Sequence, residues 1–175
     1  ATYMKEFNGT MSIYPTKWCE DSDMRIATDA CQQGYGAVFG NKWFAGTWSA
    51  EDEVLAKRLK RDSMPWKELH TLVRAAATWG NEWKGKNIKF HLDCEPMVHA
   101  VEKGGSRSPE IMSLIRTLSY IAVRSGFYYT VSHIAGRLNV GPDLLSRNRV
   151  SVFLAQFPHS NRSPVIPSTL PCHTW

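Results

Sequence analysis

The N-terminal third of the chain has the residue pattern of short β-strands. Apolar and polar residues alternate over residues 24–31, and a period of two is typical of a strand with one buried face. Two more apolar runs follow, over residues 35–39 and 43–48, each after a turn that contains glycine. Short strands joined by tight turns predict an antiparallel meander.

The middle of the chain has helical spacing instead. Residues 51–62 are rich in charge and predict a short, irregular, exposed helix. A long amphipathic helix begins at residues 63–65, where a proline costs no hydrogen bond in the first turn, and it ends at Gly85. The pattern then predicts a strand over 87–92, a helix over 96–103, a long amphipathic helix over 109–122, a strand over 127–134 and a helical turn from residue 141.

The order of these elements predicts an α/β fold built on one sheet. Strands connected through helices pair in parallel, whereas the initial meander is antiparallel, so the sheet is mixed and helices flank it. Proline and serine become frequent after residue 150, which predicts an extended Pro/Ser-rich tail. We therefore divide the chain into an N-terminal arm or linker (1–23), an α/β domain (24–149) and a C-terminal tail (150–175).

Composition and charge exclude several classes of protein. Apolar residues make up 43% of the chain, which is enough for a sizeable core, and no run of them is long enough for a transmembrane helix. The four cysteines form no Cys-x-x-Cys pair, which argues against a zinc framework and against a disulfide-rich secreted scaffold. We expect an intracellular protein, in the cytoplasm or the nucleus, without membrane contact. The net charge of +5 favours a polyanionic partner such as nucleic acid.

Four acidic residues lie where apolar surroundings make a lone carboxylate costly. They are Asp29 inside the first predicted strand, Glu68 near the start of the long helix, Asp93 directly after the strand over 87–92, and Asp143 in the last helix. If the first and fourth strands are neighbours, Asp29 and Asp93 face each other at strand ends, where sites gather. Two of the acids also have simpler interpretations: Asp143 as a helix cap, and Glu68 as a first-turn acid favoured by the helix dipole.

Carboxylates at close quarters repel one another, so we expect divalent cations to balance them. Oxygen ligands without cysteine or histidine favour Mg²⁺ or Mn²⁺ over zinc. Such a site suits two-metal phosphoryl chemistry, in which ions roughly 3.5–4 Å apart stabilise the attacking and leaving oxygens. A glycosidase with a carboxylate pair is an alternative that explains neither the four acids nor the basic surplus.

Six short motifs lie in a defined order along the chain. They are Thr28-Asp29-Ala30, Gly34-Tyr35-Gly36-Ala37, Glu68-Leu69, Leu92-Asp93, His133-Ile134-Ala135-Gly136 and Asn139-x-x-x-Asp143-Leu144-Leu145-Ser146-Arg147. In this order they resemble the ribonuclease H domain that follows a reverse transcriptase in retroelements. Other segments are similar to the DIRS and Ngaro group, the retrotransposons that carry a tyrosine recombinase: Phe7-Asn8-Gly9, Trp79-Gly80 with Trp83, Ser108-Pro109-Glu110-Ile111-Met112 and Ile166-Pro167.

This resemblance implies a fold, an activity and a cofactor. The fold is a ribonuclease H-like α/β fold with a five-stranded mixed sheet flanked by helices, over residues 24–149. The activity is endonucleolytic hydrolysis of the RNA strand of RNA–DNA hybrids during reverse transcription, leaving 5′-phosphate and 3′-hydroxyl ends. The cofactor is a pair of Mg²⁺ ions, for which Mn²⁺ substitutes, and a reverse transcriptase domain in the same polyprotein is the expected partner. The residues at the metal-ligand and catalytic positions of the family are Asp29, Glu68, Asp93 and Asp143.

The resemblance also suggests contacts with nucleic acid. We expect backbone groups around Ala30, Cys31 and Gly34 to meet RNA 2′-hydroxyls. Further candidate contacts are Lys103 and Arg107 beside a glycine turn, Arg137, and Trp66 near the start of the long helix. His133 is a candidate auxiliary to catalysis, with a hydrogen-bonded structural histidine as the alternative. The other tryptophans on apolar stripes are expected in the core: Trp43, Trp48, Trp79 and Trp83.

Some residues depart from the pattern of the family. Cys94 follows Asp93 where relatives commonly carry Asn or Ser, and Pro142 replaces a common Ala before Asp143. Two other functions remain as alternatives. One is another nuclease or strand-transfer enzyme of the same fold, which Glu68 disfavours. The second is a catalytically silent ribonuclease H-like module that binds nucleic acid or braces a polymerase.

Overall fold

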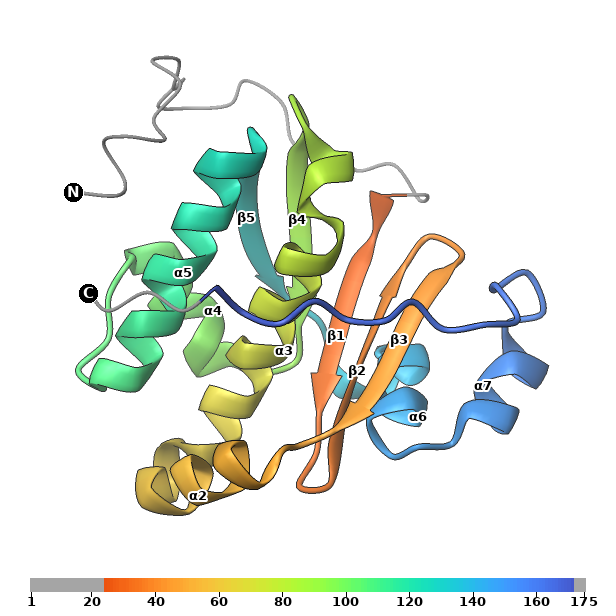
Figure 1. The fold of residues 1–175 in the computed structure, drawn as a ribbon, viewed down its shortest axis with the longest axis horizontal. Helices are drawn as coiled ribbons and strands as arrows, with labels where there is room; N and C mark the ends of the chain where they lie inside the picture. The colour runs from red at the N-terminus through yellow and green to blue at the C-terminus, as the bar shows by residue number, and fades with distance from the viewer. Residues whose placement is uncertain (1–23, 172–175) are drawn as a thin grey trace.

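A five-stranded sheet with the strand order β3-β2-β1-β4-β5 forms the centre of the protein. The structure is a computed structural model that describes residues 24–171 (Figure 1). The strands are β1 (Ile26–Ala30), β2 (Gly34–Phe39), β3 (Lys42–Thr47), β4 (Asn87–Leu92) and β5 (Tyr128–His133). β1, β2 and β3 pair antiparallel, whereas β4 pairs parallel with both β1 and β5. The predicted mixed sheet, with the first and fourth strands as neighbours, is therefore confirmed.

Helices cover both faces of this sheet (Figure 1). The α-helices are α2 (Ala50–Leu59), α3 (Ser63–Trp79), α4 (Glu95–Lys103), α5 (Pro109–Ser125), α6 (Val140–Ser146) and α7 (Val150–Gln156). Short 3-10 helices are η2 (Lys60–Asp62), η3 (Gly80–Trp83) and η4 (Gly136–Leu138). α3 packs on β1, β2 and α5, while α6 packs on β1, β2 and β3. None of the helices formed by residues 24–171 combines the length and the apolar character needed to span a bilayer.

Each face of the sheet has its own hydrophobic cluster. Because successive strand residues point to opposite faces, Ala37 of β2 joins the large cluster with α3 and α5, and Val38 joins the smaller one with α6. The four tryptophans expected in the core are at most 8% exposed: Trp43, Trp48, Trp79 and Trp83. Their predicted burial is confirmed.

α2 is more regular than its charge-rich sequence predicts. Its first turn is closed by a capping box, in which Ser49 and Asp52 exchange hydrogen bonds with each other's backbone. These bonds satisfy amide groups that a helix start otherwise leaves unpaired. The helix is as exposed as expected, because among its residues only Ala56 is buried.

The segment after residue 149 differs from the extended tail that its composition predicts. Residues 150–156 form α7, because the fully buried Phe153 packs against Trp43 with ring centroids 5.4 Å apart. Residues 157–171 have no helix or strand, but they are held against the domain. The amide of Val165 donates to the carbonyl oxygen of Trp43 at 2.8 Å, and the amide of Ser168 donates to Thr78 Oγ1 at 3.0 Å. The predicted arm over residues 1–23 lies outside the described residues.

Candidate active site

Asp29 and Asp93 are brought together by the parallel pairing of β1 and β4. In this pairing Ala27 lies opposite His91, so Asp29 and Asp93 are each two residues further along and reach the same edge of the sheet. This edge is where the carboxyl ends of parallel strands meet and where sites in α/β folds gather. The predicted juxtaposition of the two acids is confirmed.

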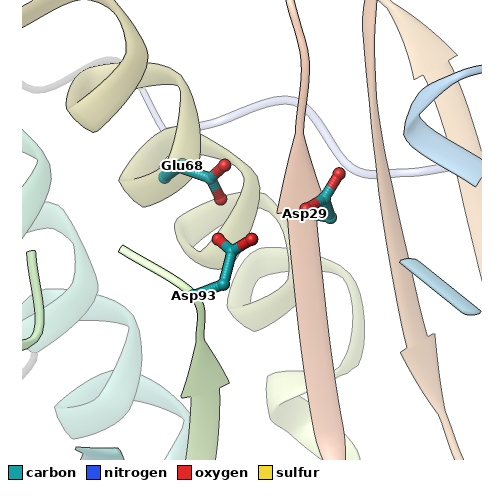
Figure 2. Close-up of side chains that lie close together, drawn as sticks. All are labelled: Asp29, Glu68 and Asp93. Atoms are coloured by element: carbon teal, nitrogen blue, oxygen red, sulfur yellow. The ribbon is translucent and has the colours of Figure 1, made fainter. Parts of the chain in front are cut away.

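Glu68 reaches the same place from α3, the helix that packs on β1. Its Oε1 accepts a hydrogen bond from the amide of Ala30 at 3.3 Å. Ligand oxygens of Asp29, Glu68 and Asp93 all lie within 4.8 Å of one another. Figure 2 shows the three side chains gathering in one space, Asp29 from β1, Glu68 from α3 and Asp93 from the segment directly after β4.

The electrostatics of this trio favour a bound cation. Asp29 is 4% exposed and Glu68 is 6% exposed. Burial, followed by repulsion from neighbouring acids, raises the pKa of Glu68 to about 9. Burial likewise raises the pKa of Asp29 to about 7, although a hydrogen bond from Ser146 opposes the shift. The pKa of Asp93 is raised as well, mainly by burial. Burial and mutual repulsion thus disfavour the charged form of these carboxylates. A bound divalent cation supplies the positive charge that stabilises this form.

One buried oxygen of the trio has no hydrogen-bond partner among residues 24–171. This is Glu68 Oε2, whereas Oε1 of the same carboxylate receives the Ala30 amide. An unpaired buried carboxylate oxygen is costly unless a ligand or water meets it. The donor set, made only of carboxylate oxygens, fits a hard cation such as Mg²⁺ or Mn²⁺.

Asp143 lies beside the trio and is not one of its members. It comes from the first turn of α6, and its Oδ1 accepts a hydrogen bond from Arg147 Nε at 2.8 Å. Its negative charge contributes to the raised pKa values of Asp29 and Asp93. The structure therefore gathers three of the four predicted acids and holds the fourth close enough to act on two of them electrostatically.

Two buried polar residues of α6 and its start were not singled out by the sequence. Ser146, 2% exposed, donates its hydroxyl to Asp29 Oδ2 at 2.5 Å. Asn139, 1% exposed, donates from Nδ2 to the carbonyl oxygen of Thr28 at 2.9 Å. Both contacts join α6 to β1 at the site. Both residues belong to a motif identified from the sequence, but the motif alone does not show which of its polar members are buried.

A glycine in β2 allows α6 to lie this close to the sheet. Gly36 pairs with Asp29 across the β1–β2 ladder. A Cβ atom added at Gly36 would stand 2.4 Å from Leu145 Cβ and 2.8 Å from the backbone nitrogen of Ser146. The glycine is therefore required for the position of Ser146, and through it for the orientation of Asp29.

The predicted basic contacts are exposed. Lys103 ends α4 and Arg107 follows in the loop before α5. α4 begins two residues after Asp93 and, with nine residues, is about 13 Å long, so this loop lies well away from the carboxylates. Arg137 is nearer, because a Cβ added at the preceding Gly136 would lie 3.4 Å from Asp93 Oδ2.

Trp66 does not have the surface position expected of a nucleic-acid contact. It is 4% exposed and packs against His70, with ring centroids 4.8 Å apart, and against Trp48. The sequence prediction is wrong in this respect, because α3 is buried on more sides than its amphipathic stripe indicates. Eleven of its residues are buried, including Glu68 and His70.

Of the backbone groups predicted to meet RNA 2′-hydroxyls, the three amides have partners inside the protein. Ala30 donates to Glu68, Cys31 donates to the carbonyl oxygen of Gly34, and the Gly34 amide donates to Cys31 Sγ. These amides therefore shape the turn that follows β1. Any contact of this turn with RNA would involve other atoms.

His133 and Cys94 both lie next to Asp93. His133 is exposed at the end of β5, and its charge opposes the raised pKa of Asp93. Cys94 is half-buried with a free thiol, and burial raises its pKa. A thiol held in its neutral form is a poor competitor for a hard cation.

Comparison with known proteins identifies the fold. The sequence matches no protein-family model and no curated protein. The structure is similar to the crystal structure of RNase H1 from the halophilic archaeon Halobacterium salinarum NRC-1, with a TM-score of 0.50 and 10% sequence identity. The similarity covers 73% of this chain and 98% of that one. The protein thus has a ribonuclease H-like α/β fold, as the sequence predicts.

Proposed function

We propose that this protein is a metal-dependent endonuclease that hydrolyses the RNA strand of RNA–DNA hybrids. The observation that carries the proposal is the trio of Asp29 and Glu68, both buried, with the half-buried Asp93, whose ligand oxygens all lie within 4.8 Å of one another. Its position at the carboxyl ends of β1 and β4, in a ribonuclease H-like fold, adds support. Within residues 24–171 no basic side chain forms an ion pair with any of the three acids. Clustered acids of which two are buried are unfavourable for stability alone, which favours a functional explanation.

The trio and Asp143 are the residues that would hold Mg²⁺, with Mn²⁺ as a substitute. We propose two ions, because four carboxylates are available and each ion needs several oxygens. When bound, such ions supply positive charge for the scissile phosphate and lower the pKa of an attacking water. Glu68 Oε2 has no hydrogen-bond partner in the described part of the chain, so it offers a ligand atom without the loss of a hydrogen bond there.

The remaining residues of the site position the carboxylates. Ser146 holds one oxygen of Asp29 and leaves the other for a ligand. The amide of Ala30 orients Glu68, and Arg147 orients Asp143. We propose His133, exposed beside Asp93, as an auxiliary residue that carries a proton between the site and solvent.

The cellular context is proposed from sequence motifs alone. The ordered acids with Ser146-Arg147 after Asp143 resemble retroelement ribonuclease H domains, and the flanking segments resemble the DIRS and Ngaro group. On this basis we propose that the protein acts on hybrids made by a reverse transcriptase domain of the same polyprotein.

A paired-variant cleavage assay tests the proposed function. Asp93→Asn should abolish RNA cleavage in a labelled hybrid while the hybrid still binds, because the carboxamide keeps the shape of the side chain and removes a ligand charge. Glu102→Gln, at an exposed position on α4, is the matched control and should cleave like the wild type. Cleavage that survives Asp93→Asn would overturn the site assignment. Binding without cleavage by the wild type would favour a catalytically silent module instead.

A further inference from the structure

A pocket of about 500 Å³ lies next to the carboxylates, on the side of the sheet edge formed by β3. Its walls come from β3, from the end of α6 and from the segment that follows α7. The residues relevant to its chemistry are Gln33, Trp43, Thr47, Arg147, Asn148 and Arg162. This pocket is separate from the carboxylate trio, since none of the three acids lines it.

The lining of this pocket is basic. Among residues 24–171 it contains Arg147 and Arg162 and no acidic residue. Arg147 is shared with Asp143 through one hydrogen bond, but its side chain is 55% exposed, which leaves donors for another partner. Arg162 is exposed and has no acidic partner among residues 24–171. Two guanidinium groups with amide and hydroxyl neighbours match the chemistry of phosphate and sugar oxygens.

The backbone around Arg162 is held in place although it lies in a segment without regular structure. The amide of Asn161 donates to the carbonyl oxygen of Asn41 at 2.8 Å, and Trp43 Nε1 donates to the carbonyl oxygen of Asn161 at 2.7 Å. Three residues after Arg162, the amide of Val165 donates to Trp43. The backbone on both sides of Arg162 is therefore anchored, to the β2–β3 turn at Asn41 and to Trp43 of β3.

The pocket and the carboxylate site share two residues at the C-terminal end of α6. Ser146 lines the pocket and also donates to Asp29. Arg147 lines the pocket and also donates to Asp143. A nucleic-acid strand with a phosphate at the carboxylates therefore has the pocket within reach of its neighbouring nucleotides.

We propose that this pocket binds the sugar-phosphate backbone of a nucleic-acid strand on its way from the carboxylate site. The inference rests on the proposed function and adds a binding surface to it. Arg162 binds a phosphate, Arg147 joins it from α6, and Gln33 and Asn148 offer amide groups to sugar or phosphate oxygens. The segment after α7, residues 157–171, thus contributes to substrate binding in addition to packing along β3.

Salt-dependent binding tests this assignment. Fluorescence anisotropy would measure hybrid affinity from low to high NaCl in the Asp93→Asn background, with and without Arg162→Gln. Loss of one phosphate contact should weaken binding roughly fivefold at low salt and reduce the slope of log affinity against log salt by about one. Arg124→Gln, at an exposed position in the last turn of α5, is the matched control and should keep the slope. An unchanged slope for Arg162→Gln, in a variant with unchanged Tm, would overturn the pocket assignment.

Two further arms separate the pocket from the proposed function and locate the strand. Hybrids with a single-stranded RNA or DNA extension are compared, and the extension whose added affinity depends on Arg162 identifies the strand in the pocket. If the wild-type protein cleaves the hybrid but Arg162→Gln leaves the salt slope of binding unchanged, the pocket assignment alone is rejected. A slope that depends on Arg162 without any wild-type cleavage would reject the nuclease function and keep the pocket as a nucleic-acid site. Absence of all hybrid binding would reject both.

Discussion

The two faces of β1 are held in different ways. Toward α3 and α5, Ile26 packs into a core of large rings that includes Trp79 and Trp83. Toward α6, Asp29 is held by Ser146, and the helix is admitted by a glycine in the neighbouring strand. The first face depends on buried apolar area, whereas the second depends on a few individual contacts.

This difference suggests a division of roles within one sheet. Apolar packing is spread over many contacts and tolerates substitutions that conserve volume, so we assign most of the stability to the α3 face. A buried carboxylate held by a single hydroxyl is sensitive to the loss of that hydroxyl. We therefore assign the geometry of the site to the α6 face.

Neutralising Asp29 should lower activity while it raises the stability of the metal-free protein. Asp29→Asn should lower hybrid cleavage by roughly a thousandfold, because a metal ligand worth several kcal/mol is lost. The same change should raise the Tm of the metal-free protein, since it removes a buried charge from the trio. Initial cleavage rates and thermal melts in EDTA check both effects. Activity within tenfold of wild type would contradict the assignment of Asp29 as a ligand.

Removing a core ring should affect stability before it affects chemistry. Trp83→Ala should lower the free energy of unfolding by about 3–5 kcal/mol, because the fully buried indole leaves a cavity. Trp83→Phe is the matched control and should cost much less, since Trp83 Nε1 has no hydrogen-bond partner among the residues that the structure describes. Urea unfolding measures both variants. Equal losses of unfolding free energy in the two variants would show that buried side-chain volume does not determine stability on the α3 face.

The pH dependence of the metal-free protein should reveal the carboxylate trio. Because the pKa of Glu68 is raised to about 9, the folded state keeps a proton that the unfolded state releases near pH 4, so stability falls as pH rises from about 4 to 9. Glu68→Gln should therefore raise the Tm more at pH 8 than at pH 5, by about 4 °C or more at pH 8. Mg²⁺ should reduce this difference by stabilising the wild type. A Tm difference between Glu68→Gln and the wild type that is the same at pH 5 and pH 8 would contradict the account.

Filling the space at Gly36 should disturb the α6 face selectively. Gly36→Ala should cost about 1–3 kcal/mol, because its Cβ would stand 2.4 Å from Leu145 Cβ. Cleavage should fall as well, even under conditions where the variant is fully folded, because displacement of α6 moves Ser146 away from Asp29. Gly105→Ala, where an added Cβ meets nothing within 4 Å, is the control. A fully active Gly36→Ala variant would show that the position of α6 is unimportant for the site.

The smallest expected effect comes from one hydroxyl. Ser146→Ala should cost about 1 kcal/mol in stability and about tenfold in cleavage at limiting Mg²⁺, because Asp29 loses its orienting hydrogen bond. Saturating Mg²⁺ should restore part of the rate. Ser151→Ala, at an exposed position on α7, serves as the reference. An unchanged Mg²⁺ requirement would limit Ser146 to a structural role.

The parts of this molecule that the sequence predicted are those with repetitive patterns. Alternation and helical spacing identified all five strands, and the order of the elements placed Asp29 beside Asp93. Composition was a poorer indicator. It suggested an extended tail where Phe153 makes a helix, because one buried ring outweighs the neighbouring prolines and serines.

The site was predictable in its acids and less so in what surrounds them. Acids in apolar surroundings stand out in a sequence, because their burial needs compensation. Ser146 and Asn139 do not stand out, because serine and asparagine are common on surfaces. Trp66 was misplaced for the opposite reason: a tryptophan near a site suggests base stacking, whereas here it packs against His70.

Cleavage of a hybrid labelled on its RNA strand tests the central claim most directly. Wild-type protein would be incubated with this hybrid, with single-stranded RNA and with double-stranded DNA, in Mg²⁺, in Mn²⁺ and in EDTA. The account predicts cutting of the RNA strand in the hybrid alone, with either metal and not in EDTA, and products that carry 5′-phosphates. Cutting that persists in EDTA, or equal cutting of all three substrates, would contradict it.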